Sequence, residues 1–126
     1  MDMNKKKINC FHDLNVWDEG HKLVLSIYKL VEKLPSKERF ILGSQMLRAV
    51  ISITSNIAEG FGRRGLKEKI QFYSISRASL TELQNQLFIC RDVGYLSARK
   101  FDLIWEQSVV VHKMLNALIK SLRTKT

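Results

Sequence analysis

Residues Gln45 to Arg64 read QMLRAVISITSNIAEGFGRR, and this stretch decides how the rest of the sequence folds. Apolar residues recur along it at the spacings of three and four that are typical of an amphipathic helix: Met46, Val50, Ile53, Ile57 and Phe61. Three glycines and two arginines then follow within residues 60–65. The pattern predicts a long helix that ends near residue 60 and breaks into a flexible, basic turn.

A second, polar stripe follows the same helix, well away from the apolar one. At about 100° per residue it consists of Arg48, Ser52, Asn56, Glu59 and Arg63. Polar side chains in a fixed register often specify one packing partner, as a buried asparagine does in coiled coils. We expect the first four to lie at an interface between helices or between subunits, and plain exposure to solvent is the alternative.

Turn signals on both sides of this helix divide the chain into four segments of similar length. They lie at Leu34 to Ser36 around Pro35, at residues 60–65, and at residues 94–97. Each segment has helical periodicity, and none alternates with a period of two over a useful length. We predict helices at about 15–34, 37–60, 66–93 and 98–123.

The expected helix ends have residues suited to them. Asp13 or Asn15 can cap the first helix, and Ser36 can cap the second. Gly94 can adopt the left-handed conformation that ends the third helix, and Ser97 can cap the fourth. Short connections between long helices predict one all-α domain over residues 1–126, an antiparallel up-down-up-down four-helix bundle.

The formal net charge is +9, from 21 basic and 12 acidic side chains. A field of this sign attracts polyanions, although charge alone also describes a soluble basic surface. Basic side chains gather after the second helix and along the fourth, where they could neutralise phosphates: Arg63, Arg64, Lys67, Lys113, Lys120 and Arg123. A helix hairpin with solvated arginines is the alternative for the first three.

The sequence lacks the usual signals for catalysis or metal binding. The three histidines lie on different segments, and the Glu-x-x-His pattern of bundle metal sites does not occur. The glycine-rich turn lacks the Gly-Lys-Ser/Thr ending of a phosphate-binding loop. Cys10 and Cys90 have no zinc spacing. We therefore expect a protein that is not an enzyme, with no catalytic residues, metal or cofactor.

The sequence also predicts a cytoplasmic protein without a membrane partner. The opening MDMNKKKINC is basic but no apolar segment of a signal peptide follows it. No apolar run reaches the ~18 residues of a membrane span.

Nearly the whole chain resembles one family. The opening of the first helix (Phe11, Asp13, Leu14, Trp17) resembles its F-x-D-L-x-V-W motif. Gln45 to Arg64 resembles its most distinctive motif, Q-x-x-R-A-x-x-S-I-x-x-N-I-A-E-G-x-x-R, and Ser76 to Leu87 resembles A-x-G-S-x-x-E-L-x-x-Q-L. The family is that of the 23S rRNA intervening-sequence proteins, whose relatives are the accessory variability proteins of diversity-generating retroelements.

The resemblance implies a bundle that assembles as a ring, typically a homopentamer, with no known enzymatic activity. For the retroelement relatives it implies binding of RNA or DNA and of a reverse transcriptase. We expect a non-enzymatic, oligomeric accessory protein that binds nucleic acid, RNA rather than DNA. The alternative is an oligomeric protein-interaction scaffold, for example for a reverse transcriptase, without direct nucleic-acid binding.

Overall fold

The computed structural model describes residues 7–126, so most of the basic opening, including Lys5 and Lys6, lies outside the described residues. Within them the chain is helical and has no strand. Its elements are η1 (Phe11–Asp13), α1 (Asn15–Glu32), α2 (Ser36–Glu38), η2 (Arg39–Gly43), α3 (Ser44–Gly62), α4 (Leu66–Asp92) and α5 (Ala98–Arg123). The predicted all-helical class with four long helices is confirmed.

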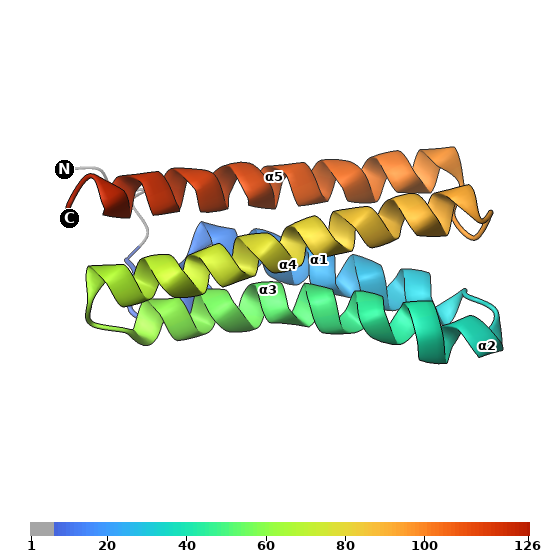
Figure 1. Cartoon of the computed structure of the whole chain (residues 1–126), viewed down its shortest axis with the longest axis horizontal. Coiled ribbons are helices and arrows are strands. Elements are labelled where there is room, and N and C mark those ends of the chain that lie inside the picture. The colour runs from blue at the N-terminus through green and yellow to red at the C-terminus, as the bar shows by residue number, and fades with distance from the viewer. Residues whose placement is uncertain (1–6) are drawn as a thin grey trace.

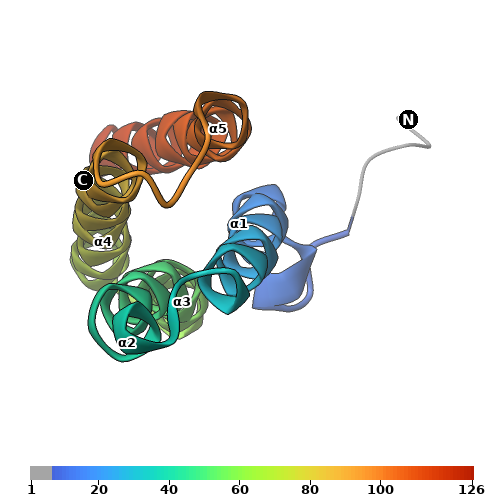
Figure 2. The same ribbon diagram turned by 90° about the vertical axis from the view of Figure 1, so that its right-hand side faces the viewer.

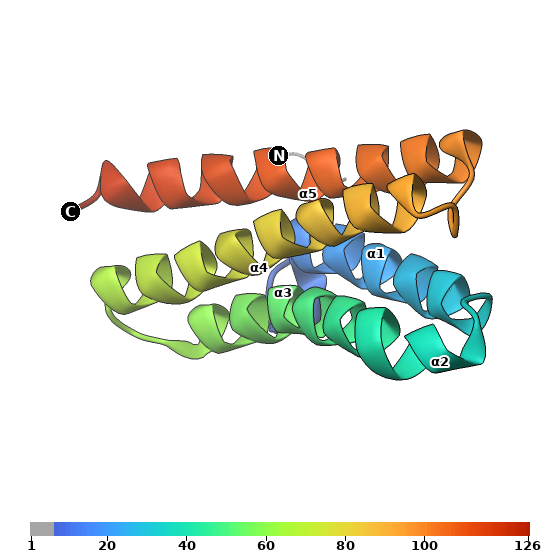
Figure 3. The same cartoon turned by 45° about the vertical axis from the view of Figure 1, so that its right-hand side comes forward.

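The four long helices surround one core, and each lies beside two others. Helix α1 packs on α3 and α5, and α4 packs on the same two helices from the other side. The chain turns back at each connection (Figure 1). The α3–α4 turn and the C-terminal end of α5 therefore lie at one end of the molecule, which we call the hairpin end (Figures 1 and 3). The α4–α5 connection lies at the opposite end.

The apolar stripes expected from the sequence form the core. All four long helices contribute side chains that are less than 2% exposed, among them Ile27, Ile53, Leu83 and Leu115. Burying one such side chain contributes about 1.5–3 kcal/mol, so these stripes supply most of the favourable energy of folding. None of the described helices is both long enough and apolar enough to cross a membrane.

The second predicted helix, 37–60, differs from the structure near its start. The helical run begins at Ser36, and residues Arg39–Gly43 form a π-helical segment before α3 continues to Gly62. Arg39 ties this segment to the end of α1, because its guanidinium donates to the carbonyls of Leu34 (3.2 Å) and Glu32 (2.7 Å). A π turn holds an extra residue, so spacings of three and four could not reveal it.

Two of the predicted helix ends are confirmed. Gly94 has φ +89°, the left-handed conformation after α4. The Oγ atom of Ser97 accepts a hydrogen bond from the Lys100 backbone N–H at 3.2 Å, which caps α5.

The other two caps were predicted wrongly. Neither Asp13 nor Asn15 caps α1; its N-cap residue is Leu14, which makes no side-chain cap bond. The Asp13 carboxylate instead accepts the backbone N–H groups of Asn9 (3.0 Å) and Cys10 (3.1 Å), so it stabilises the preceding η1 turn. Pro35, rather than Ser36, is the N-cap residue of α2. The chain has an extra turn before α1, which shifted the cap assignment.

Helices α3 and α4 approach each other most closely near Gly60. A Cβ atom on Gly60 would lie 2.7 Å from a ring carbon of the buried Tyr73. Three residues after Tyr73 on α4, the buried Ser76 hydroxyl donates to the Ile53 carbonyl at 2.8 Å. Small residues therefore let the backbones of these two helices come together.

We expect Gly60→Ala to lower the free energy of unfolding by ~1–3 kcal/mol, because the new methyl group overpacks against Tyr73. Urea denaturation measures the change. Gly62→Ala is the matched control: it lies two residues further on in the same helix, and nothing approaches its Cβ position within 4 Å. Equal stability of the two variants would contradict the close packing.

Cys90 is fully buried in the core, and Cys10 is exposed. Burial, assisted by the negative charge of Glu38, raises the pKa of the Cys90 thiol to about 11. The folded protein therefore holds this proton more tightly than the unfolded chain, where a thiol has a pKa of about 8.5.

The stabilising contribution of the protonated Cys90 thiol should be complete below about pH 8.5 and should be lost as the pH rises through about 11. Urea denaturation of the wild type and of Cys90→Ala between these pH values tests this. The stability difference between them should shrink as the pH rises, because the alanine variant lacks the titrating group. A difference that stays constant with pH would contradict the prediction.

Candidate nucleic-acid interface

The polar stripe of α3 divides into a packed part and an exposed part. Ser52 faces α4: its hydroxyl and the Ser79 hydroxyl are 2.7 Å apart. The Asn56 amide donates to the Ser52 carbonyl at 2.8 Å and to its Oγ atom at 3.0 Å. Ser52 thus lies between helices of one chain with Ser79 as its partner on α4, and Asn56 supports Ser52 from within α3.

Arg48 and Glu59 lie at the exposed part of the stripe. Arg48 donates to the side chain of Gln45 at 2.5 Å, and Glu59 forms an ion pair of 3.3 Å with Arg63. Exposed ion pairs of this kind contribute about 0–1 kcal/mol. Both side chains remain accessible to another molecule, and their assignment to a subunit interface stays a prediction.

The α3–α4 turn presents its basic residues unequally. Arg63 is engaged within the chain, since its guanidinium also lies 4.7 Å from the centre of the Phe72 ring. Lys69, on the first turn of α4, donates to the carbonyls of Gly60 (3.2 Å) and Phe61 (2.7 Å) and so caps α3. Arg64 and Lys67 are exposed and form no ion pair among residues 7–126. They are the free cations of the turn.

The basic residues of α5 reach the same end of the molecule. Lys120 and Arg123 are exposed near the C-terminal end of α5 and line a shallow groove together with Arg77 of α4. The guanidinium of Arg77 donates to the Asn116 side chain at 2.9 Å, which holds it beside the groove. Lys113 lies two helical turns earlier on α5, about 10 Å along its axis.

The structure therefore gathers five of the six predicted phosphate-binding residues at the hairpin end, and Lys113 extends them along α5. We call the free cations the basic end: Arg64, Lys67, Lys120 and Arg123. Arg77 was missed by the sequence reasoning. It lies in the middle of α4, eight residues after Lys69 and fourteen before Arg91, so it belongs to no basic cluster in the sequence. Only the packing of α4 on α5 brings it to this surface.

One group of side chains in the described part of the chain could hold a metal ion. Ligand atoms of Cys10, His12 and Asp13 lie within 4.8 Å of one another. Cys10 and His12 are exposed, and the Asp13 carboxylate already accepts two backbone N–H groups. The expectation of a protein without metal or cofactor stays a prediction.

The fold and this surface define a class: a small, basic, all-helical protein with cations gathered at one end of a four-helix arrangement. The chain matches the family model of the 23S rRNA-intervening sequence protein over residues 12–117, and it belongs to that family. No curated protein matches it.

A solved structure has the same fold. It is the crystal structure of a protein of unknown function from the S23 ribosomal protein family of Bacteroides thetaiotaomicron VPI-5482. The TM-score is 0.79 at 24% sequence identity, over 83% of this chain and 95% of that one. At this identity the likeness concerns the fold alone.

The Ser52–Ser79 pair gives a prediction for the α3–α4 contact. Either single substitution removes the hydrogen bond between the two helices, so Ser52→Ala or Ser79→Ala should each lower the free energy of unfolding by ~1 kcal/mol. The double variant should be less destabilised than the sum of the two, by ~0.5–1.5 kcal/mol. Urea denaturation of all four proteins measures this coupling. Additive effects would mean that the hydroxyls do not interact.

Proposed function

We propose that this chain is a non-enzymatic, cytoplasmic accessory protein that binds nucleic acid through the basic end. The observation that carries the proposal is the gathering of Arg64, Lys67, Lys120 and Arg123 at one end of the molecule without ion-pair partners among the described residues. Unpaired cations bind phosphates and release counterions, so affinity comes from the nucleic-acid backbone. The net charge of +9 increases the rate of encounter.

RNA is the preferred ligand in this proposal. The family is named for an intervening sequence of 23S rRNA, which supports an RNA context. The chain has no strand platform of aromatic residues among residues 7–126, so shape and charge of the RNA, rather than its base sequence, would guide binding. A kinship with accessory proteins of diversity-generating retroelements is part of the same proposal.

The proposal includes assembly of several copies into a ring, with five as the expected number. Two apolar residues of the π segment are exposed, Phe40 by 83% and Ile41 by 64%. Ile41 lines a groove between α3 and α4 that also contains Gln86. Gln86 is only 6% exposed, and its Oε1 atom has no hydrogen-bond partner in the described part of the chain. A second copy that supplies a donor here would satisfy that oxygen.

The same exposed apolar groove favours a second candidate function, an oligomeric protein-interaction scaffold. Its partner would be a protein such as a reverse transcriptase, and the positive charge would only assist encounter. Contiguous exposed apolar surface is typical of protein–protein contacts, whereas phosphate contacts need cations. The two functions therefore predict different effects of removing basic side chains.

Measuring the affinity for a structured RNA against salt concentration tests the first function, using nucleic-acid-free protein of known oligomeric mass. The logarithm of the binding constant should fall linearly with the logarithm of the salt concentration, with a slope of about −0.7 to −0.9 per phosphate contact. The double variant Arg64→Gln/Lys67→Gln should weaken binding of all RNA sequences and reduce the slope by about one per lost contact.

Lys37→Gln/Arg99→Gln is the matched control. It removes the same charge from exposed positions, Lys37 in α2 and Arg99 at the start of α5, away from the hairpin end. Equal losses in both double variants would mean that binding follows net charge and that the basic end is not the site. No binding even at low salt would reject the first function and favour the scaffold.

A further inference from the structure

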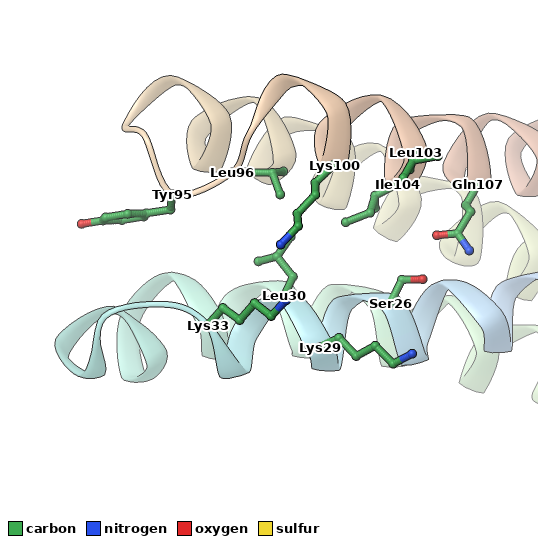
Figure 4. Close-up of a pocket in the computed structure, with 10 residues that line it drawn as sticks. All are labelled: Ser26, Lys29, Leu30, Lys33, Tyr95, Leu96, Lys100, Leu103, Ile104 and Gln107. Atoms are coloured by element: carbon green, nitrogen blue, oxygen red, sulfur yellow. The ribbon is translucent and has the colours of Figure 1, made fainter.

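A groove of about 460 Å³ lies between α1 and α5, on a different side of the molecule from the α3–α4 contact (Figure 4). Its floor is apolar and consists of Leu30 from α1 and Leu96 and Ile104 from the chain around the start of α5. Leu103 forms part of its wall and is 61% exposed. Side chains of α1 and α5 therefore leave an open space between the two helices here.

Two lysines converge over this floor. Lys33, the residue after α1, and Lys100 of α5 extend toward each other from opposite sides (Figure 4). Their ammonium groups are close enough that contact with Lys33, together with its charge, lowers the pKa of Lys100. Two ammonium groups that lie close together repel each other. An oxyanion placed between them would remove this repulsion and accept a charge-assisted hydrogen bond from each.

No carboxylate among residues 7–126 forms an ion pair with these lysines. The residues that line the groove include no aspartate or glutamate, and they add a third cation, Lys29, at its edge. Lys29, Lys33 and Lys100 form no ion pair with any residue in 7–126. The site is therefore positive and lacks an anion of its own.

The other end of the groove is neutral and polar. Ser26 of α1 and Gln107 of α5 face each other there (Figure 4). Lys100 and Gln107 are seven residues apart on one helix, so the apolar floor between them is about 10 Å long. A ligand that fills the groove has an anionic head at the lysines and an apolar body over Leu30 and Ile104.

We propose that the α1–α5 groove binds a small amphiphilic anion, with a phosphate or carboxylate head between Lys33 and Lys100 and an apolar body of about 10 Å along the floor. This site is separate from the basic end and does not depend on nucleic-acid binding. A bound anion would hold α1 and α5 together across the groove.

Titration calorimetry with hexyl phosphate tests the proposal, with hexanoate, inorganic phosphate and hexanol as partial ligands. Hexyl phosphate should bind saturably, once per chain, and at least about tenfold tighter than inorganic phosphate or hexanol, because it satisfies both parts of the groove. Comparison with hexanoate distinguishes a phosphate head from a carboxylate head, and either preference supports the site.

Variants locate the site. Lys100→Gln and Lys33→Gln should each weaken hexyl phosphate binding about tenfold or more, because one charge-assisted hydrogen bond is lost. Lys113→Gln is the matched control, with the same charge change elsewhere on α5. Leu103→Ala, at an exposed wall position, should weaken hexyl phosphate and leave inorganic phosphate unchanged.

Circular dichroism of each variant shows whether the helices persist, and we expect them to, since all four substitutions are at exposed positions. Equal weakening by Lys113→Gln and Lys100→Gln would overturn the proposal, because binding would follow surface charge. Inorganic phosphate binding as tightly as hexyl phosphate would overturn it as well. Absence of saturable hexyl phosphate binding would likewise overturn the proposal.

Discussion

The close approach of α3 and α4 at Gly60 is the constraint on which the rest of the structure depends. A side chain at this position would collide with the Tyr73 ring, so the two helices can pack only because glycine has no Cβ. The Ser52–Ser79 and Ser76–Ile53 hydrogen bonds continue the contact along the pair. These bonds satisfy the hydroxyls of Ser52, Ser76 and Ser79, whereas the buried Oε1 atom of Gln86 further along α4 has no partner within the described residues.

This tight pair also shapes the turn that follows it. Lys69 closes the end of α3 by donating to two of its last carbonyls, which leaves the turn short and well supported. The arginines of the turn are consequently carried to the tip of the molecule, where Arg64 has no partner within the described chain and Arg63 is held by Glu59. The close packing of α3 on α4 thus places the basic turn residues at the hairpin end.

Helices α1 and α5, on the opposite side of the molecule, pack less closely than α3 and α4. Helices α1 and α5 face each other through Ser26, Gln107 and paired lysines, so no small-residue contact draws them together. The groove there combines buried apolar floor with uncompensated charge. One side of the bundle is closed by hydrogen bonds within the chain, and the other is open to a ligand that brings its own negative charge.

Much of the fold could be predicted from local patterns. The three-and-four spacing placed Ile53 and Ile57 in the core, and Gly94 and Ser97 marked a helix boundary correctly. The π segment was not predictable in this way, because it adds a residue without disturbing the apolar stripe of α3. The polar stripe of α3 was predicted as an interface, but the contact of Ser52 with Ser79 of α4 became visible only in the structure.

The sequence by itself determined the helices, their buried faces and the excess of positive charge, because these depend on residues close together in the chain. The tertiary structure decided which charges are free and which are used. Arg77 joins Lys120 only through the packing of α4 on α5, and Lys33 meets Lys100 only across α1 and α5. Contacts between side chains of different helices depend on the distances and rotations between those helices, and the periodicity within one helix does not specify them.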